Sequence, residues 1–97
     1  DNALYQEAID LYSKAIEANP NDLPSYLWRG HSRYSLGYQN GIINAPLLEE
    51  CITDYTKVLQ LNRAEYEAYY YRANAKKLLN KLKVIKKINI ELSLACK

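Results

Sequence analysis

The feature that most constrains this chain is a helix–turn–helix pattern that occurs twice, 43 residues apart. Its first copy lies in residues 5–37, where an amphipathic segment ends at an Asn-Pro-Asn-Asp turn and a second helical segment follows. The residues that recur at this offset are Ile9, Tyr12, Lys14, Asn19, Tyr26, Arg29 and Leu36, which return as Ile52, Tyr55, Lys57, Asn62, Tyr69, Arg72 and Leu79. A repeated helical pair of this size is typical of a solenoid, in which neighbouring units stack to bury one core.

Apolar residues recur at helical spacing along most of the chain. We expect five helices, at residues 3–18, 24–36, 46–61, 65–79 and 82–95. Pro20 ends the first helix, because a proline disfavours the helical backbone at the residue before it. Only Asn80 separates the last two helices, so a tight turn there and a single long helix both remain open.

Residues 38–46 form the one irregular segment, and Asn40-Gly41 predicts a turn within it. Gly37 can end the preceding helix in the left-handed conformation, and Pro46 fits the start of the next helix. Gly30 lies inside a helix, where it costs about 1 kcal/mol relative to alanine. We therefore expect another helix backbone to approach closely at Gly30.

Composition indicates a folded domain without a membrane span. The chain has 97 residues, of which 48% are hydrophobic and 25% charged, which favours one globular domain over disorder. Ten tyrosines and one tryptophan favour aromatic rings at edges and grooves, where their polar ends stay hydrated. No apolar run is long enough to cross a bilayer, and no signal peptide is visible. Because the chain lacks a starting Met and opens in helical pattern, we expect it to be a fragment of a longer protein.

The residues that could carry chemistry are few. Cys51 and Cys96 match no metal or redox spacing, and we interpret both as small buried residues in a reducing compartment, which favours the cytoplasm. His31 is the single histidine, and no glycine-rich phosphate loop, triad or metal-ligand cluster accompanies it. We therefore expect no catalytic residue, no metal and no cofactor.

Charge is concentrated at the C-terminal end. Residues 1–75 carry a net charge of −4, whereas residues 76–97 carry +6. The predicted basic surface comprises Lys76, Lys81, Lys83, Lys86 and Lys87. Three interpretations stay open: a solvated helix face, a surface for anionic membrane or nucleic acid, and a helix that docks on the parent chain. Membrane and nucleic acid are not favoured, because no arginine-rich or glycine-aromatic motif is present.

The spacing of small and aromatic residues resembles the tetratricopeptide repeat, a 34-residue unit of two antiparallel helices, A and B. Helix B positions are matched by Ala8, Tyr12, Ala15 and Pro20, and again by Cys51, Tyr55 and Val58. Tyr26 with Gly30, and Tyr69 with Ala73, match the opening of helix A. The chain departs from the family where Arg33 takes an aromatic position, where Arg63 replaces the closing proline and where Asn89 takes the aromatic position of the last helix B.

The resemblance implies an all-α fold, a right-handed α-solenoid of antiparallel helix pairs with about two and a half repeats. Its units are residues 1–22 (helix B of a truncated repeat), 23–65 (a repeat with an insertion near 38–46) and 66–97 (a degenerate third repeat).

The resemblance also implies a function. The A helices of such a solenoid line a concave groove, here with Leu27, Trp28, His31, Tyr34, Ser35, Tyr70, Tyr71, Asn74 and Lys77. We therefore expect a non-catalytic scaffold that binds a peptide or partner protein, or alternatively a structural segment that binds its own parent chain or a second copy as a homodimer. Some relatives clamp acidic chaperone tails with basic side chains, but Trp28, Glu67 and Tyr71 take those positions here, so the clamp is not supported.

Overall fold

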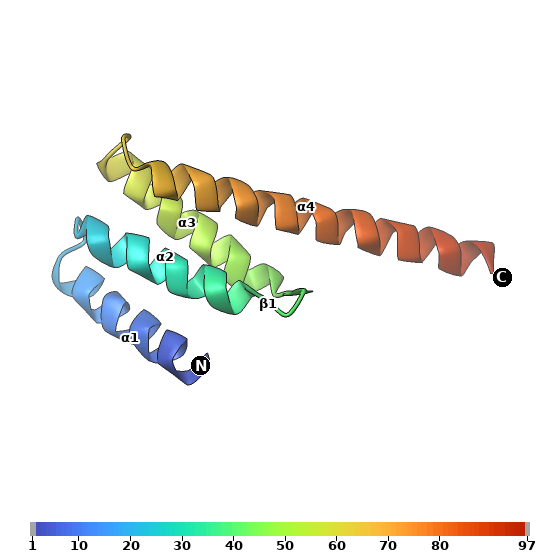
Figure 1. Ribbon diagram of the computed structural model, residues 1–97, viewed down its shortest axis with the longest axis horizontal. Coiled ribbons are helices and arrows are strands. Elements are labelled where there is room, and N and C mark those ends of the chain that lie inside the picture. Colours follow the sequence, from blue (N-terminus) through green and yellow to red (C-terminus); the bar gives the residue numbers. More distant parts are fainter. Residues whose placement is uncertain (1, 97) are drawn as a thin grey trace.

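The computed structural model describes residues 2–96 as four helices and a small β-hairpin (Figure 1). The elements in chain order are α1 (Asn2–Ala18), α2 (Leu23–Gly37), β1 (Tyr38–Gln39), β2 (Ile42–Ile43), α3 (Ala45–Leu61) and α4 (Tyr66–Ala95). Apart from the hairpin, the fold is all-α, as predicted.

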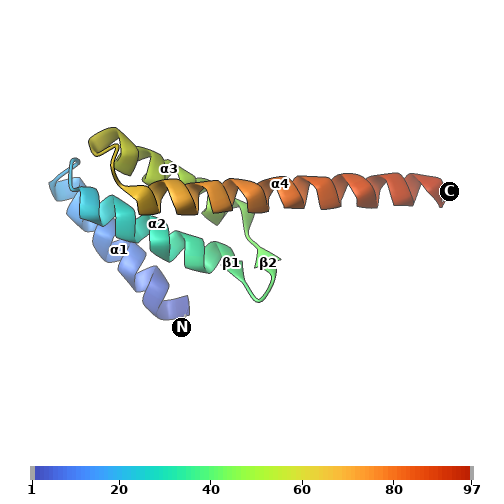
Figure 2. The ribbon, with the colours of Figure 1, turned by 45° about the horizontal axis from the view of Figure 1, so that its top comes forward.

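The helices pack in sequence order. Helix α2 lies between α1 and α3, and α3 lies between α2 and α4. Helix α4 runs along the body and then projects well beyond it, as both ribbon views show (Figures 1 and 2). The molecule is accordingly elongated, with extents of 56 × 30 × 20 Å.

Helix α3 supplies most of the core. Its buried residues include Leu48, Cys51, Tyr55, Val58 and Leu59, and they pack with Leu27 of α2 and with Ala68 and Ala75 of α4. The two alanines lack bulky side chains, so α4 can approach α3 closely while the larger α3 side chains fill the space between the helices.

The 43-residue offset in the sequence reappears in the hydrogen bonds. Asn19 Oδ1 accepts from the backbone N–H of Asn21, and Asn62 Oδ1 accepts from that of Ala64 in the same way. Arg29 donates to the Ser13 hydroxyl at 3.1 Å, and Arg72 donates to the Thr56 hydroxyl at 3.2 Å. The two copies of the pattern therefore form equivalent turns and equivalent contacts between helices.

The prediction of five helices is wrong, because α4 continues through Asn80 as one 30-residue helix. Asparagine carries only a modest helix penalty, and the leucines and lysines on either side are good helix formers. Without a glycine or proline nothing forces a turn at Asn80. Residues 66–95 therefore do not fold back into a third helical pair.

Residues 38–43 form an antiparallel hairpin rather than an irregular loop, with Tyr38 opposite Ile43. The turn predicted at Asn40-Gly41 is confirmed: their φ angles are 52° and 75°, as a two-residue hairpin turn requires. Pro46 does stand in the first turn of α3, and Asn44 before it accepts a hydrogen bond from the Leu47 N–H.

Two glycine predictions need correction. Gly37 is not left-handed, and the chain leaves α2 directly into the extended backbone of Tyr38. A Cβ at Gly37 would lie 2.7 Å from Leu48 Cδ2, so close packing explains this glycine. Close packing was expected at Gly30 as well, but the neighbour there is the Tyr55 ring and not a helix backbone.

Candidate functional site

A hollow of about 260 Å³ lies between α2 and α4. Its lining residues are Trp28, His31, Tyr34, Ser35, Glu67 and Tyr71, and we call this surface the aromatic groove. Trp28, His31 and Ser35 follow one another at spacings of three and four along α2, so they share one helix face. All lining residues except Glu67 were predicted for a groove from the sequence.

The rings of the aromatic groove meet edge to face. Tyr71 lies at the centre, with its ring centroid 4.8 Å from His31, 5.3 Å from Tyr34 and 5.1 Å from Tyr70, at interplanar angles between 71° and 87°. Trp28 meets His31 at 5.2 Å and 67°. Such T-shaped contacts favour fixed ring positions. The walls of the groove are therefore rings in mutual contact, and Trp28 remains 49% exposed.

His31 connects the groove to the core. Its Nδ1 lies 2.7 Å from the Tyr55 hydroxyl and its Nε2 lies 3.3 Å from Glu67 Oε2. The Glu67 carboxylate can only accept, so Nε2 carries a proton and donates to it. In the neutral ring Nδ1 then accepts from the Tyr55 hydroxyl, whose pKa burial raises well above its usual value. This chain of contacts fixes both the tautomer and the orientation of the imidazole.

The other residues predicted for the groove do not line it. Leu27 is 8% exposed and belongs to the core, because it lies one position before Trp28 on the side of α2 that faces α3. Tyr70 is exposed, and its ring contacts that of Tyr71. Asn74 is half-buried and Lys77 is exposed, and both lie further along α4.

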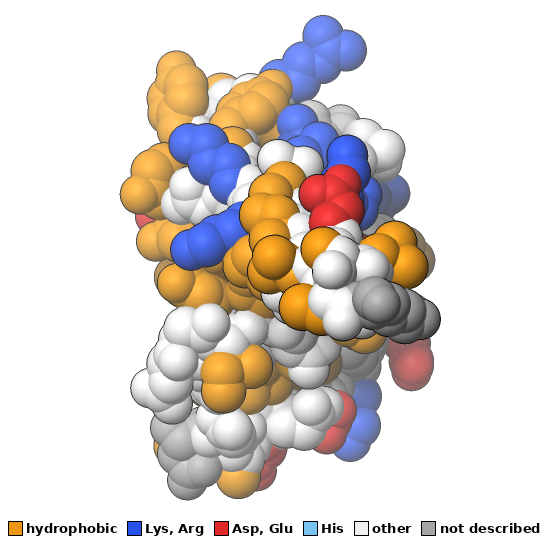
Figure 3. Space-filling model, turned by 90° about the vertical axis from the view of Figure 1, so that its right-hand side faces the viewer, with side chains coloured by type: hydrophobic (Ala, Val, Ile, Leu, Met, Phe, Trp, Pro, Cys, Tyr) orange, Lys and Arg blue, Asp and Glu red, His pale blue; other side chains and the backbone are white. Residues whose placement is uncertain are grey.

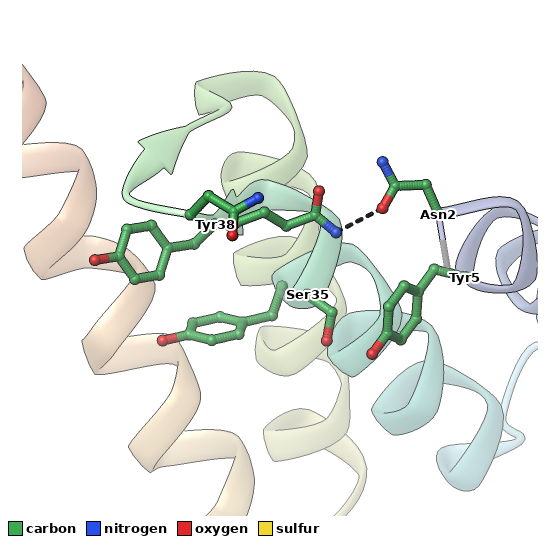
Figure 4. A pocket seen from close by; sticks show the side chains of 7 residues that line it. Asn2, Tyr5, Ser35 and Tyr38 are labelled. Atoms are coloured by element: carbon green, nitrogen blue, oxygen red, sulfur yellow. Dashed lines mark hydrogen bonds between the residues drawn. The ribbon is translucent and has the colours of Figure 1, made fainter.

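A second hollow adjoins the aromatic groove at Tyr34 and Ser35, which line both. Asn2 and Tyr5 of α1 and Tyr38, Gln39 and Asn40 of the hairpin complete it. In Figure 4, Tyr5 lies on the α1 side and Tyr38 on the opposite side, and Gln39 Nε2 donates to Asn2 Oδ1 at 2.7 Å. We call this second surface the hairpin hollow.

The sequence reading missed a buried ionic network beneath α2. Asp54, which is 1% exposed, accepts hydrogen bonds from Arg29 at 2.7 Å and from Arg33 at 2.8 Å. Arg29 contacts α3 through this carboxylate. Two sequence features could have indicated this network. Asp54 is an acid on the apolar face of α3, and Arg33 takes a position where the tetratricopeptide pattern has an aromatic residue.

The predicted basic surface lies mostly on the projecting half of α4. Lys76, Lys81, Lys83, Lys86 and Lys87 are all exposed. Exposed apolar side chains accompany them, namely Val84, Ile85, Ile88, Ile90, Leu92 and Leu94. Figure 3 looks toward this end of the molecule and shows hydrophobic and basic side chains next to each other.

The two cysteines differ. Cys51 is buried, and burial together with the nearby Asp54 carboxylate raises its pKa to about 12. Cys96 is exposed, so the prediction that it is buried is wrong. It follows the last residue of the projecting helix.

Three comparisons bear on the chain as a whole. No family model, no curated protein and no solved structure matches it.

Among residues 2–96, no three His, Cys, Asp or Glu side chains gather as metal ligands. The four described helices include none that is long and apolar enough to cross a membrane.

Proposed function

We propose that this chain is a non-catalytic interaction domain, built as a tetratricopeptide-like solenoid segment, that binds an extended peptide of a partner protein. The observation that carries the proposal is the continuity of the two hollows: the aromatic groove and the hairpin hollow share Tyr34 and Ser35 and together follow α2. Rigid aromatic side chains with polar ends are the residues that dominate the binding energy of protein interfaces.

The charge of this surface also bears on the partner. No lysine or arginine lines either hollow among the described residues, and Glu67 is the one charged side chain of the aromatic groove. A carboxylate tail would find no basic partner there, which supports the earlier inference against an acidic chaperone tail.

A display selection of random peptides on the chain tests the proposal. We expect the selected peptides to lose at least about tenfold in affinity to Trp28→Ala, because a central aromatic anchor contributes on the order of 2 kcal/mol. Tyr66→Ala is the matched control, since Tyr66 is a highly exposed aromatic residue that lines neither hollow. Peptides that bind equally to both variants would contradict the proposal.

The projecting half of α4 favours a second candidate, self-association. Its exposed apolar residues need a cover, and its lysines disfavour pairing with the same helix of another copy. The outer face of α1 offers both complements: Leu4 and Leu11 are exposed there, and three acids, Glu7, Asp10 and Glu17, accompany them with one lysine, Lys14. The second candidate therefore places α4 of one copy against α1 of another.

Light scattering over a range of concentrations tests the second candidate. We expect a mass above the monomer that Ile88→Glu and Leu11→Asp each reduce, whereas Ile90→Glu, on a different face of α4, has a smaller effect. A monomer at all concentrations overturns self-association. If Trp28→Ala instead dissociates the assembly, the aromatic groove is the interface between copies and the peptide proposal fails.

A further inference from the structure

We propose that the aromatic groove accepts a positively charged side chain of the partner, an alkylammonium such as lysine or methylated lysine, or a guanidinium. The inference rests on the proposed function and names the chemistry of the ligand that the groove would hold. Three features of the groove carry it: the arrangement of its rings, the sign of its charge and the existing use of tyrosine rings elsewhere in the chain.

The aromatic rings that line the hollow stand at steep angles to one another. Because Trp28 meets His31 at 67° and Tyr71 meets Tyr34 at 71°, the lining rings are not stacked on each other. They surround a hollow of about 260 Å³, which is large enough for a methylated ammonium group. A cation within about 6 Å of such ring centroids is attracted by the negative π face, whereas an anion is repelled.

The charge of the groove has the matching sign. The Glu67 side chain is 62% exposed at the rim, and its contact with His31 uses Oε2. The two arginines nearest on α2, Arg29 and Arg33, are engaged by the Asp54 carboxylate and do not line the groove. A cation would therefore meet a carboxylate that no lysine or arginine lining the groove engages, and it would share that carboxylate with the His31 Nε2 contact.

The chain already places cations over tyrosine rings at other sites. Arg29 lies 5.6 Å from the centroid of Tyr26, and Arg72 lies 5.7 Å from that of Tyr69, at equivalent positions of the two repeats. Among the described residues, the cation–ring contacts involve Tyr26 and Tyr69 and none of the groove rings. The groove rings are thus available to a cation from outside the chain.

Choline and dimethylbutanol, in which a carbon replaces the choline nitrogen, test the inference as a pair of equal shape. Trp28 is the single tryptophan, so its fluorescence reports binding in the groove. We expect a saturable change with choline and an affinity for the neutral alcohol that is lower by about tenfold or more, since desolvated cation–π contacts have this size. Equal binding of the two probes, or no binding of choline, overturns the inference.

Matched charge variants locate the site. Glu67→Gln keeps the shape and should weaken choline binding several-fold, while Glu49→Gln removes the same charge from an exposed position on α3 and should leave it unchanged. Tyr34→Leu removes a ring wall and should weaken binding further, with circular dichroism to check that the variant is folded. An equal effect of the two glutamine variants would indicate a diffuse charge effect and overturn the site.

Different results separate this inference from the proposed function. Nα-acetylated amides of lysine, trimethyllysine and arginine, measured in the same way, distinguish the three sources of a cation. Selected peptides that depend on Trp28 without enrichment in lysine or arginine, together with no choline binding, overturn the cation and leave the peptide proposal standing. If the chain prefers choline to the neutral alcohol but no selected peptide depends on Trp28, the peptide proposal is overturned and the cation site stands.

Discussion

Gly30 shows how a single position joins the core to the candidate site. A Cβ on Gly30 would lie 2.9 Å from Cε1 of Tyr55 and 3.2 Å from its Cδ1 and Cζ atoms. The Tyr55 ring is fully buried and its hydroxyl contacts His31, so it cannot move aside without disturbing the groove. The missing side chain at Gly30 therefore makes room for the ring that holds His31 in place.

We predict that Gly30→Ala destabilises the protein despite the better helix propensity of alanine. Propensity favours the variant by about 1 kcal/mol, but overpacking against a fixed ring costs about 1 to 3 kcal/mol. Urea unfolding monitored by circular dichroism measures the balance. In a double-mutant cycle with Tyr55→Leu the penalty should shrink, and a penalty that is independent of Tyr55 would contradict this explanation.

Asp54 is the second residue on which the packing depends. Two guanidinium groups, those of Arg29 and Arg33, point at its buried carboxylate, so its removal leaves partly buried cations without a counter-charge. We predict that Asp54→Asn lowers the free energy of unfolding by about 3 kcal/mol. Glu50→Gln is the control, because Glu50 pairs with Arg33 at the surface and its loss should cost less than about 1 kcal/mol. Equal losses would mean that burial of the network is unimportant.

At the scale of elements, α4 consists of two halves in different surroundings. Its first half packs on α3 through Ala68 and Ala75, with Leu78, Leu79 and Leu82 partly buried. From residue 83 to residue 96 every side chain is exposed. Helical hydrogen bonds alone hold the second half, and isolated helices of this length are marginal in water.

We predict that amide hydrogen exchange divides α4 near residue 83. Amides of residues 70–82 should be protected nearly as well as those of α3, whereas residues 84–94 should exchange at least about a hundredfold faster, since few tertiary contacts oppose local opening. The comparison is made at a concentration where light scattering shows a monomer. Uniform protection along α4 in that monomer would show that the second half is covered. If exchange slows as the concentration rises, the self-association candidate gains support.

For the molecule as a whole, burial keeps three side chains protonated to a higher pH than in the unfolded chain. Burial raises the pKa of the Cys51 thiol from 9.0 to about 12, and burial also raises the pKa values of Tyr55 and Tyr34 above 10.0. In the pH range between the unfolded and folded pKa values, the native state binds more protons than the unfolded chain. The stability that the Cys51 thiol contributes is therefore present below pH 9.0 and is lost as the pH rises toward 12.

We predict that the contribution of Cys51 to the free energy of unfolding falls by about 1 to 2 kcal/mol between about pH 8 and pH 10.5. Urea titrations at the two pH values measure the difference. Cys51→Ala, which introduces the residue found at the equivalent Ala8, should reduce the decline because it removes one of these protons. If the free energy of unfolding of Cys51→Ala falls as much as that of the unchanged protein, other groups cause the fall. A free energy of unfolding that stays constant up to pH 10.5 in the unchanged protein would contradict the prediction.

The local features of this protein follow from short stretches of its amino-acid sequence. Periodic apolar residues placed the first three helices to within a residue at each end, and Asn40-Gly41 fixed a turn because both positions need a positive φ. The 43-residue offset determined which turns and helix contacts would be equivalent. The face of α2 that carries Trp28 and His31 also followed from spacing, because helical geometry alone relates these positions.

Which side chains meet across helices depends on how the helices pack. The pairing of Asp54 with Arg29 and Arg33 joins residues more than 20 positions apart, and no local pattern specifies such a partner. The same holds for Tyr55 beneath His31 and for Glu67 at the groove rim. Asn80 has only a small preference for a turn over a helix, and no packing against another helix favours a turn there. Helix α4 therefore continues through Asn80. Local propensity is encoded in neighbouring residues, whereas a buried polar pair or a groove exists only once distant segments are packed together.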